Sequence, residues 1–248
     1  MSDPRRVADS ATTLAAPRPV GESGGVTNDI AASSAQTFPP SGYVGDAAAQ
    51  EEWDRRYTDR EQLWSGQPNG TLVAEVADLA PGRALDVGCG EGADAVWLAR
   101  AGWDVTALEV SGVALSRAAR HAQDAGVNIH WVHAGLAEAA LPPASFDLVS
   151  AQYPALPRTP DGAAEKALVA AVAPGGVLLF VHHAGMESQP VNDSGFDPAA
   201  YVWPSMVIAL LDEDWAIEVN EQRPRVIPEG GAGAHHAEDV VIRARRLR

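Results

Sequence analysis

The chain has 248 residues, 46% of them apolar, and its 33 acidic residues against 18 lysines and arginines give a formal net charge of −15. This length can form one good-sized hydrophobic core, whereas the acidic charge argues against nucleic acid as a partner because no basic face is available for phosphates. The single cysteine excludes a disulfide framework and a four-cysteine metal site, and no stretch approaches the roughly 18 apolar residues of a membrane span, so a cytoplasmic protein without membrane contact is expected.

The first 49 residues differ in composition from the rest of the chain. Small residues and proline dominate them, and they show no sustained apolar periodicity. Such a segment cannot bury enough apolar surface to fold by itself. The sequence therefore predicts a disordered tail over 1–49 and one folded domain over 50–248.

Seven short apolar runs rich in β-branched residues predict seven strands, at 83–88, 105–110, 128–133, 146–151, 176–182, 215–220 and 238–243. Helical patterns at 92–101, 112–125 and 161–173 separate most of the first five runs, which is typical of a parallel sheet with helices on both faces. A loop rich in proline and glycine joins the last two runs, so they are expected to pair as an antiparallel hairpin. The predicted fold is α/β, with a mostly parallel seven-stranded sheet.

The first predicted strand ends in three alternating glycines, Gly88, Gly90 and Gly92. Glycine tolerates the positive φ angles of a sharp strand-to-helix turn and lets a ligand approach the main chain. Glu109 closes the second strand about 20 residues later, where a carboxylate can accept both hydroxyls of a ribose. Asp86 can either anchor the glycine loop or reach a cationic group. The pattern indicates a nucleotide-like cofactor.

The glycines alone leave two cofactor classes open. Gly88, Gly90 and Ala93 also satisfy the dinucleotide fingerprint of NAD(P)-dependent oxidoreductases. Such an enzyme usually begins with this strand and needs a second mononucleotide-binding half, whereas about 80 residues precede the strand here and a hairpin ends the chain. The surroundings of the turn therefore favour a different family.

The chain resembles the class I S-adenosylmethionine-dependent methyltransferases over roughly 50–248, with the Rossmann-like fold of that superfamily. The resemblance rests on the motifs Leu85-Asp86-Val87-Gly88-Cys89-Gly90-Glu91-Gly92, Glu109, Phe146-Asp147-Leu148-Val149 and Pro174-Gly175-Gly176-Val177-Leu178. Within the superfamily, Trp53-Asp54-Arg55-Arg56-Tyr57 and Trp64-Ser65-Gly66-Gln67-Pro68-Asn69 look like the N-terminal segment of the small-molecule enzymes of the tellurite-resistance and thiopurine methyltransferase-like group.

This resemblance implies S-adenosylmethionine as cofactor and assigns residues to its parts. Tyr57 and Trp64 would cover the site, and Asp86 would lie near the amino group of the methionine moiety. Adenine would lie beside Val110, and backbone groups around Gly135 and Leu136 would hold it, because Gly135 stands where the family often has an acid. The complete implied cofactor site comprises Tyr57, Trp64, Asp86, Gly88, Cys89, Gly90, Glu109, Val110, Gly135, Leu136, Gln152 and Tyr153.

The expected reaction is transfer of a methyl group by in-line displacement to a small-molecule nucleophile: a thiol, a phenol or hydroxyl, a heterocycle or a chalcogen oxyanion. A methyl group on a sulfonium is already electrophilic, so alignment and exclusion of water matter most. Soft anions need no base, whereas a phenol or hydroxyl benefits from one. A non-catalytic protein that binds the cofactor or a partner remains an alternative. A methyltransferase acting on nucleic-acid or protein amines is disfavoured, because Gln152-Tyr153-Pro154 replaces the expected Asn/Asp-Pro-Pro-Tyr motif.

Two histidine pairs, His182-His183 and His235-His236, are expected at the same edge of the sheet. They could serve as structural hydrogen-bonding groups, as a general base that also orients substrate, or, least readily, as ligands of a divalent metal; no metal is predicted. We hypothesise that at least one of His182 and His183 faces the substrate, which makes both candidate catalytic residues. His130 and His133 are expected to be sheet residues.

The segment 185–211 is the predicted substrate lid, because it follows the fifth strand and mixes loop residues with adaptable apolar groups. Trp203 and Met206 within it have helical spacing and could equally serve packing.

Overall fold

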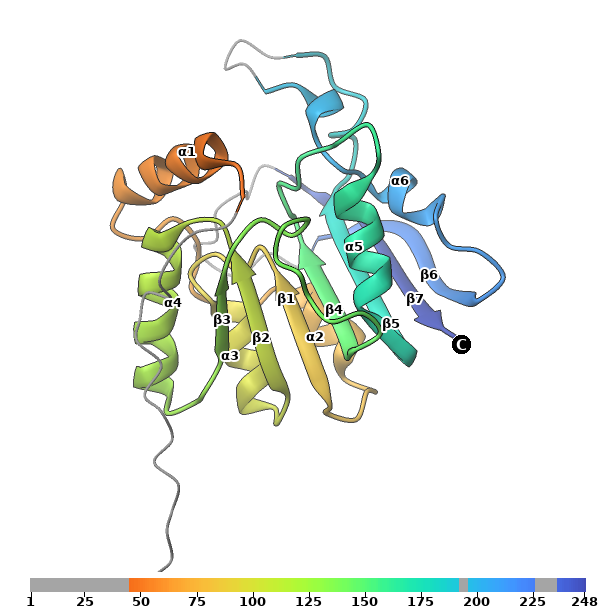
Figure 1. Cartoon of the computed structure of the whole chain (residues 1–248), viewed down its shortest axis with the longest axis horizontal. Helices are drawn as coiled ribbons and strands as arrows, with labels where there is room; N and C mark the ends of the chain where they lie inside the picture. The colour runs from red at the N-terminus through yellow and green to blue at the C-terminus, as the bar shows by residue number, and fades with distance from the viewer. Residues whose placement is uncertain (1–44, 192–195, 226–235) are drawn as a thin grey trace, which may run out of the picture. The chain divides into compact units, whose positions relative to one another are not determined.

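The computed structural model describes residues 45–191, 196–225 and 236–248. Seven strands form one sheet in the order β3-β2-β1-β4-β5-β7-β6 (Figure 1). Their bounds are β1 Arg83–Val87, β2 Asp104–Glu109, β3 His130–His133, β4 Phe146–Gln152, β5 Val172–His183, β6 Trp215–Pro224 and β7 Glu238–Arg246.

The predicted topology is confirmed. Strands β1 to β5 pair in parallel, and β7 lies antiparallel between β5 and β6. The register of the antiparallel pair sets His183 of β5 opposite Asp239 of β7. A nicotinamide enzyme built from two mononucleotide-binding halves would have a sixth parallel strand in place of this inserted hairpin. The fold therefore decides against the dinucleotide alternative.

Helices cover both faces of the sheet. Helices α2 (Gly70–Val76), α3 (Ala93–Arg100) and α4 (Gly112–Ala125) pack on one face through side chains such as Leu72, Leu98 and Leu115. Helices α5 (Ala163–Ala171) and α6 (Pro204–Ile208) pack on the other face, where the core includes Leu168 and Phe180, and a 3-10 turn, η1 (Pro198–Ala200), precedes α6. The central strands β1, β4 and β5 are mostly buried between these helices, which explains their apolar sequence.

Two expectations about element boundaries need correction. Helix α1 (Ala47–Thr58) begins inside the segment predicted as tail, because the side chain of Asp46 caps it by accepting a hydrogen bond from the backbone N–H of Ala48 (2.9 Å). The glycine-rich motif Pro174-Gly175-Gly176 lies within β5, which starts directly after α5, and the pairing with β4 shifts register there. Residues 1–44 of the predicted tail lie outside the described residues.

In Figure 1 the parallel strands point their carboxyl ends toward the edge of the sheet that α1 covers. No helix among the described residues is long and apolar enough to cross a membrane.

Candidate functional site

A cavity of about 420 Å³ lies where β1, β2, β4 and β5 end, with residues of α1 and the segment 64–69 as further lining. Open α/β sheets bind their ligands at this carboxyl edge. The cavity brings together all the site residues expected from sequence: Tyr57, Trp64, Asp86, Gly88, Cys89, Gly90, Glu109, Val110, Gly135, Leu136, Gln152, Tyr153, His182 and His183. Its volume suits a ligand of cofactor size.

The glycine turn forms the floor of the cavity. Gly88, Gly90 and Gly92 have φ values of 71°, 53° and 83°, in the left-handed region that glycine enters without strain. A Cβ atom at Gly90 would lie 2.9 Å from the Tyr57 hydroxyl oxygen, whereas one at Gly88 would meet no atom within 4 Å. Gly90 is thus required for close approach of the covering aromatic residues.

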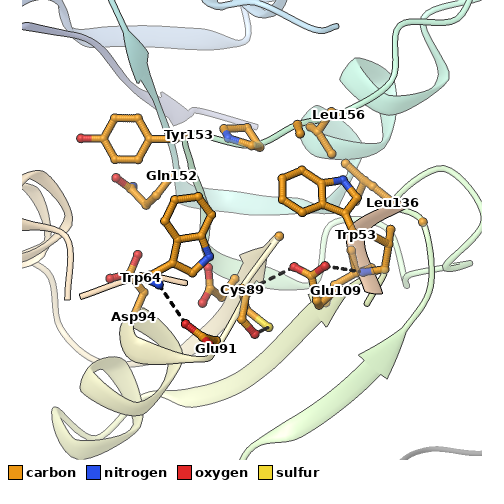
Figure 2. A pocket seen from close by; sticks show the side chains of 18 of the residues that line it. Trp53, Trp64, Cys89, Glu91, Asp94, Glu109, Leu136, Gln152, Tyr153 and Leu156 are labelled. Atoms are coloured by element: carbon orange, nitrogen blue, oxygen red, sulfur yellow. Dashed lines mark hydrogen bonds between the residues drawn. The ribbon is translucent and has the colours of Figure 1, made fainter. Parts of the chain in front are cut away.

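Glu109 ends β2 and accepts three backbone hydrogen bonds, each of 3.0 Å, from the N–H groups of Gly90, Val110 and Ser111. Burial raises the pKa of this carboxyl group, and the three N–H donors oppose the increase. The carboxylate is held between the glycine turn and the start of α4 (Figure 2). It is oriented to accept hydrogen bonds from a diol in the cavity.

Asp86 supplies a buried carboxylate with one unsatisfied oxygen. Its Oδ2 has no hydrogen-bond partner among the described residues, and burial together with the nearby charges of Asp94 and Glu109 raises its pKa. Asp94 accepts hydrogen bonds from the backbone N–H and the side-chain amide of Asn69, both 2.7 Å. A cationic group in the cavity would satisfy Asp86 Oδ2 and relieve the repulsion, so the site fits the ammonium group of an amino acid.

Aromatic side chains cover the cavity. The Trp64 indole N–H donates a 2.9 Å hydrogen bond to the Tyr57 hydroxyl, and the rings of Trp53 and Trp64 lie above Cys89 and Glu109 (Figure 2). Burial is the main reason why the Tyr57 pKa is raised, so its hydroxyl stays protonated. Sequence reasoning assigned no role to Trp53, although it belongs to the motif that carried the subgroup resemblance.

Side chains from the glycine turn and from α4 fix this cover in place. Glu91 accepts hydrogen bonds from the backbone N–H groups of Leu63 and Trp64 and forms a 2.8 Å ion pair with Arg117. Arg117 also donates 2.8 Å hydrogen bonds to the carbonyl oxygens of Tyr57 and Arg60. The sequence alone did not reveal this network, because its partners lie 26 to 60 residues apart.

At the other end of the cavity, rings stack in a row. The Tyr153 and His183 ring centroids are 4.3 Å apart, and those of His183 and His236 are 4.1 Å apart. The Arg225 guanidinium lies 4.6 Å from the centroid of Tyr153. Tyr153 has a φ of 51°, unusual for a non-glycine residue, and its hydroxyl donates a 2.7 Å hydrogen bond to Asp239 Oδ2. Burial is the largest cause of its raised pKa, so this hydroxyl is neutral.

The two candidate catalytic histidines differ in chemistry. His182 Nδ1 accepts a 2.9 Å hydrogen bond from the backbone N–H of His183, and its ring packs 4.3 Å from that of Trp203. Burial lowers the pKa of His182 to about 4, so the neutral ring carries its proton on Nε2 and has no free lone pair. The geometry favours His183 over His182 as a base. His236 lies beside His183 as expected, whereas His235 lies outside the described residues.

The predicted lid requires a correction. No described residue of 185–211 lines the cavity; the segment 153–157 and Thr159 do so instead. Trp203 is 2% exposed and its indole N–H donates a 2.7 Å hydrogen bond to the Pro198 carbonyl, so it serves packing. Of the two β3 histidines, His133 forms a 3.0 Å hydrogen bond through Nε2 with the Val110 carbonyl oxygen, and His130 is exposed. Within the described ranges, no three His, Cys, Asp or Glu side chains are grouped to hold a metal ion.

Comparisons with known proteins agree with this geometry. Residues 84–176, which run from β1 into β5, match the family described as "Methyltransferase domain". The ubiquinone biosynthesis O-methyltransferase of Ralstonia nicotianae is 38% identical over 110 residues, which are 44% of this chain and 46% of that protein. The chain thus matches about half of the length of this curated relative.

Solved structures share the fold over most of the chain. One, from work on the conversion of a disulfide bond into a thioacetal group during echinomycin biosynthesis, has a TM-score of 0.64 and 25% identity, and the match covers 79% of this chain and 91% of that chain. The N-methyltransferase NodS of Bradyrhizobium japonicum, solved with S-adenosyl-L-homocysteine, has a TM-score of 0.58 and 20% identity, covering 79% of this chain and 98% of its own.

Proposed function

Residues 84–176 form a methyltransferase domain of the class I, S-adenosylmethionine-dependent type, and we propose that the chain transfers a methyl group from that cofactor to a small-molecule nucleophile. One observation carries the proposal: the glycine turn, Glu109 and the unsatisfied carboxylate of Asp86 line the same cavity. Together they suit a ligand with a ribose diol at one end and an ammonium group at the other.

The proposed residue roles follow from position in the cavity. Glu109 binds the ribose hydroxyls, and Asp86 binds the ammonium group. Trp53, Leu136 and Leu156 lie together on one side in Figure 2 and, with Val110 and Gly135, form an apolar slot for adenine. Gln152 and Tyr153 lie on the other side, next to the proposed methionine moiety. The acceptor then occupies the end lined by Tyr153, His183 and Arg225.

When bound, S-adenosylmethionine supplies a methyl carbon to which the lone pair of the acceptor bonds, while the carbon–sulfur electron pair returns to sulfur. The protein orients the acceptor and excludes water. The aromatic side chains of Trp53, Tyr57 and Trp64 line the cavity, and Tyr153, whose ring stacks on that of His183, lies on the side away from the apolar slot (Figure 2). Such positioning accounts for a large part of the barrier reduction in bimolecular reactions.

A thiol, a phenol or hydroxyl, a heterocycle or a chalcogen oxyanion derivative would each fit this reaction. The finer resemblance to the tellurite-resistance and thiopurine methyltransferase-like group stays a prediction. A non-catalytic cofactor-binding protein is the second candidate, because Glu109 and Asp86 would bind the cofactor without any turnover.

The test uses calorimetry with S-adenosylhomocysteine, followed by turnover of a panel of thiols, phenols and oxyanions. Glu109→Ala should weaken binding about 10- to 100-fold, because hydrogen bonds to a charged group are lost. Asp104→Ala, at the exposed opposite end of β2, is the matched control and should bind normally. Absence of binding by the unmodified protein contradicts the proposal; binding without turnover of any acceptor supports the non-catalytic alternative.

A further inference from the structure

A fully buried carboxylate lies behind the acceptor end of the cavity. Asp239 on β7 has 0% exposed surface. Its Oδ2 accepts hydrogen bonds from the hydroxyls of Tyr153 (2.7 Å) and Thr71 (3.4 Å). Its Oδ1 is buried and has no hydrogen bond with the described residues. Burial of a carboxylate oxygen is costly unless a donor satisfies it, so this oxygen needs a partner.

The nearest imidazole nitrogen is Nδ1 of His183, 3.7 Å from Asp239 Oδ1. This nitrogen is also buried and without a hydrogen bond among the described residues. The two residues are direct neighbours across the β5–β7 pair, and the Tyr153 and His236 rings fix the plane of the His183 ring. The separation is slightly longer than a hydrogen bond, and such catalytic contacts often tighten when substrate binds.

A carboxylate facing Nδ1 selects the tautomer of a neutral imidazole. The proton resides on Nδ1, toward the negative charge, and the lone pair is left on Nε2. His183 lines the cavity and exposes 16% of its side chain, while Nδ1 is its buried nitrogen. The nitrogen that can meet an acceptor is therefore Nε2. His182 cannot take this role, because its Nδ1 lone pair is already engaged.

Other polar side chains of the described residues also face this pair. Besides Tyr153 and Thr71, they include His236, which stacks on His183, His182, whose ring centroid is 5.9 Å from that of His183, and Arg225, whose Nε is 4.0 Å from Asp239 Oδ1. Arg225 supplies a competing explanation, in which Asp239 only balances the charge of the guanidinium. The two explanations differ in what happens to His183, which makes them separable by experiment.

We propose that Asp239 is a positioning residue that holds His183 with Nε2 free to accept a proton, and that the acceptor is accordingly a phenol. This inference rests on the proposed function. Thiolates and oxyanions that are already ionised need no base. An imidazole has a reference pKa of about 6.5 and a phenol of about 10, so a phenol can transfer its proton to an imidazole as it attacks. An alcohol is a far weaker acid.

The proposed step moves one proton and one methyl group. The hydroxyl proton of the phenol would pass to His183 Nε2 while the oxygen electron pair forms the new bond to the methyl carbon, and the carbon–sulfur bond would break with its electron pair going to the sulfur of the departing S-adenosylhomocysteine. The resulting imidazolium is stabilised by the Asp239 carboxylate and returns its proton to solvent after the product leaves.

The first test needs no acceptor. Long-range proton–nitrogen spectra of protein labelled with ¹⁵N-histidine report the tautomer of each of the seven histidines, and His183→Gln identifies the signal of His183. We expect the Nδ1–H tautomer at a pH where the ring is neutral, and loss of this preference in Asp239→Asn. A His183 ring protonated on Nε2 in the unmodified protein overturns the proposal.

The second test compares two phenols of similar size, one protonated and one electron-poor and already ionised at the assay pH. His183→Gln should lower turnover of the protonated phenol about 100-fold and Asp239→Asn about 10- to 100-fold, with the ionised phenol much less affected. Glu238→Gln, an exposed carboxylate-to-amide change on β7 that does not line the cavity, is the matched control and should leave the ratio between the two phenols unchanged. Equal losses for both phenols, or the same ratio change in Glu238→Gln, overturn the proposed pairing of Asp239 with His183.

The remaining outcomes separate this inference from the proposed function. Turnover of thiols or oxyanions without turnover of any phenol overturns the acceptor class and leaves the proposed function standing. Binding of S-adenosylhomocysteine without turnover also overturns the acceptor class. Absence of binding overturns the proposed function itself. Because Asp239 is buried, the unfolding transition of Asp239→Asn is compared with that of the unmodified protein. If Asp239→Asn is destabilised, His183→Gln, at a partly exposed position, provides the result.

Discussion

At the scale of single residues, Gly90 and His182 each affect the cavity through specific contacts. Gly90 leaves room for the Tyr57 hydroxyl and the Trp64 indole, and His182 uses its only lone pair on a backbone N–H. The importance of the glycine could be predicted from the sequence, because the spacing of the three glycines indicates a tight turn. That His182 cannot act as a base could not be predicted, because it depends on a hydrogen bond from the backbone N–H of the next residue.

Gly90→Ala should weaken S-adenosylhomocysteine binding about tenfold or more relative to Gly126→Ala, a change outside the cavity at a glycine whose Cβ would meet no atom within 4 Å. Both glycines have positive φ, so both alanines carry similar backbone strain, but only the Gly90 Cβ would overlap the Tyr57 hydroxyl. Calorimetry on the two variants measures the difference. Equal affinities would show that the aromatic cover plays no part in holding the cofactor.

His182 should make stability depend on pH. Burial lowers the folded-state pKa of His182 to about 4, from the ordinary histidine pKa of 6.5, so between these values the unfolded chain binds the proton and the folded chain does not. Stability is therefore retained above about pH 6.5 and falls as the pH decreases toward 4, by at most about 1.4 kcal/mol per pH unit. Urea unfolding at several pH values should show a smaller slope for His182→Asn, whose side-chain oxygen can still accept the His183 N–H. An unchanged slope contradicts this assignment.

At the scale of elements, the strands and the longer helices were predictable because their apolar periodicity is strong, as in β2 and α4. Helix α1 was not predicted, because its first residues, Ala47, Ala48 and Ala49, continue the small-residue composition of the preceding segment. Tertiary contacts stabilise this helix: the Asp54 carboxylate accepts hydrogen bonds from the Ser111 hydroxyl (2.6 Å) and the Val113 N–H (3.2 Å) at the start of α4. No local pattern reveals such contacts.

Arg117→Met should loosen the attachment of α1 and of the segment that follows it. The substitution removes the ion pair to Glu91 and the hydrogen bonds to the Tyr57 and Arg60 carbonyls, so cofactor affinity should fall about tenfold and cleavage by protease near α1 should become faster. Arg120→Met, at an exposed position of the same helix, is the control. Equal protease sensitivity of the two variants would count against an anchoring role for Arg117.

At the scale of the whole molecule, the order β3-β2-β1-β4-β5-β7-β6 determines which distant residues meet. The sequence located the proposed cofactor end of the cavity, because the candidate residues there lie in motifs close to strand ends. It did not locate Arg225 and Asp239, because their position beside Tyr153 depends on the pairing of β7 with β5. Tyr153 and Asp239 are 86 residues apart in the chain, a separation at which sequence spacing carries no information.

The cofactor should stabilise the fold as a unit. A ligand that binds only the folded state, at about 100 times its dissociation constant, adds about 2.7 kcal/mol and raises the melting temperature by several degrees for a domain of this size. Thermal unfolding with S-adenosylhomocysteine should show this shift, and Glu109→Ala should abolish most of it at the same ligand concentration. A shift of equal size in Glu109→Ala would contradict the proposed ribose-binding role.

The attachment of α1 also has a consequence for the order of folding. This helix is synthesised before the rest of the described domain, yet its anchors Ser111, Val113 and Arg117 come 57 to 60 residues after the residues that they bind, and Val113 belongs to the first turn of α4. A helix this short is marginal in water without such contacts. We therefore expect α1 to acquire protection from hydrogen exchange only after β1, α3, β2 and α4 have formed, so that the ligand cavity closes late in folding.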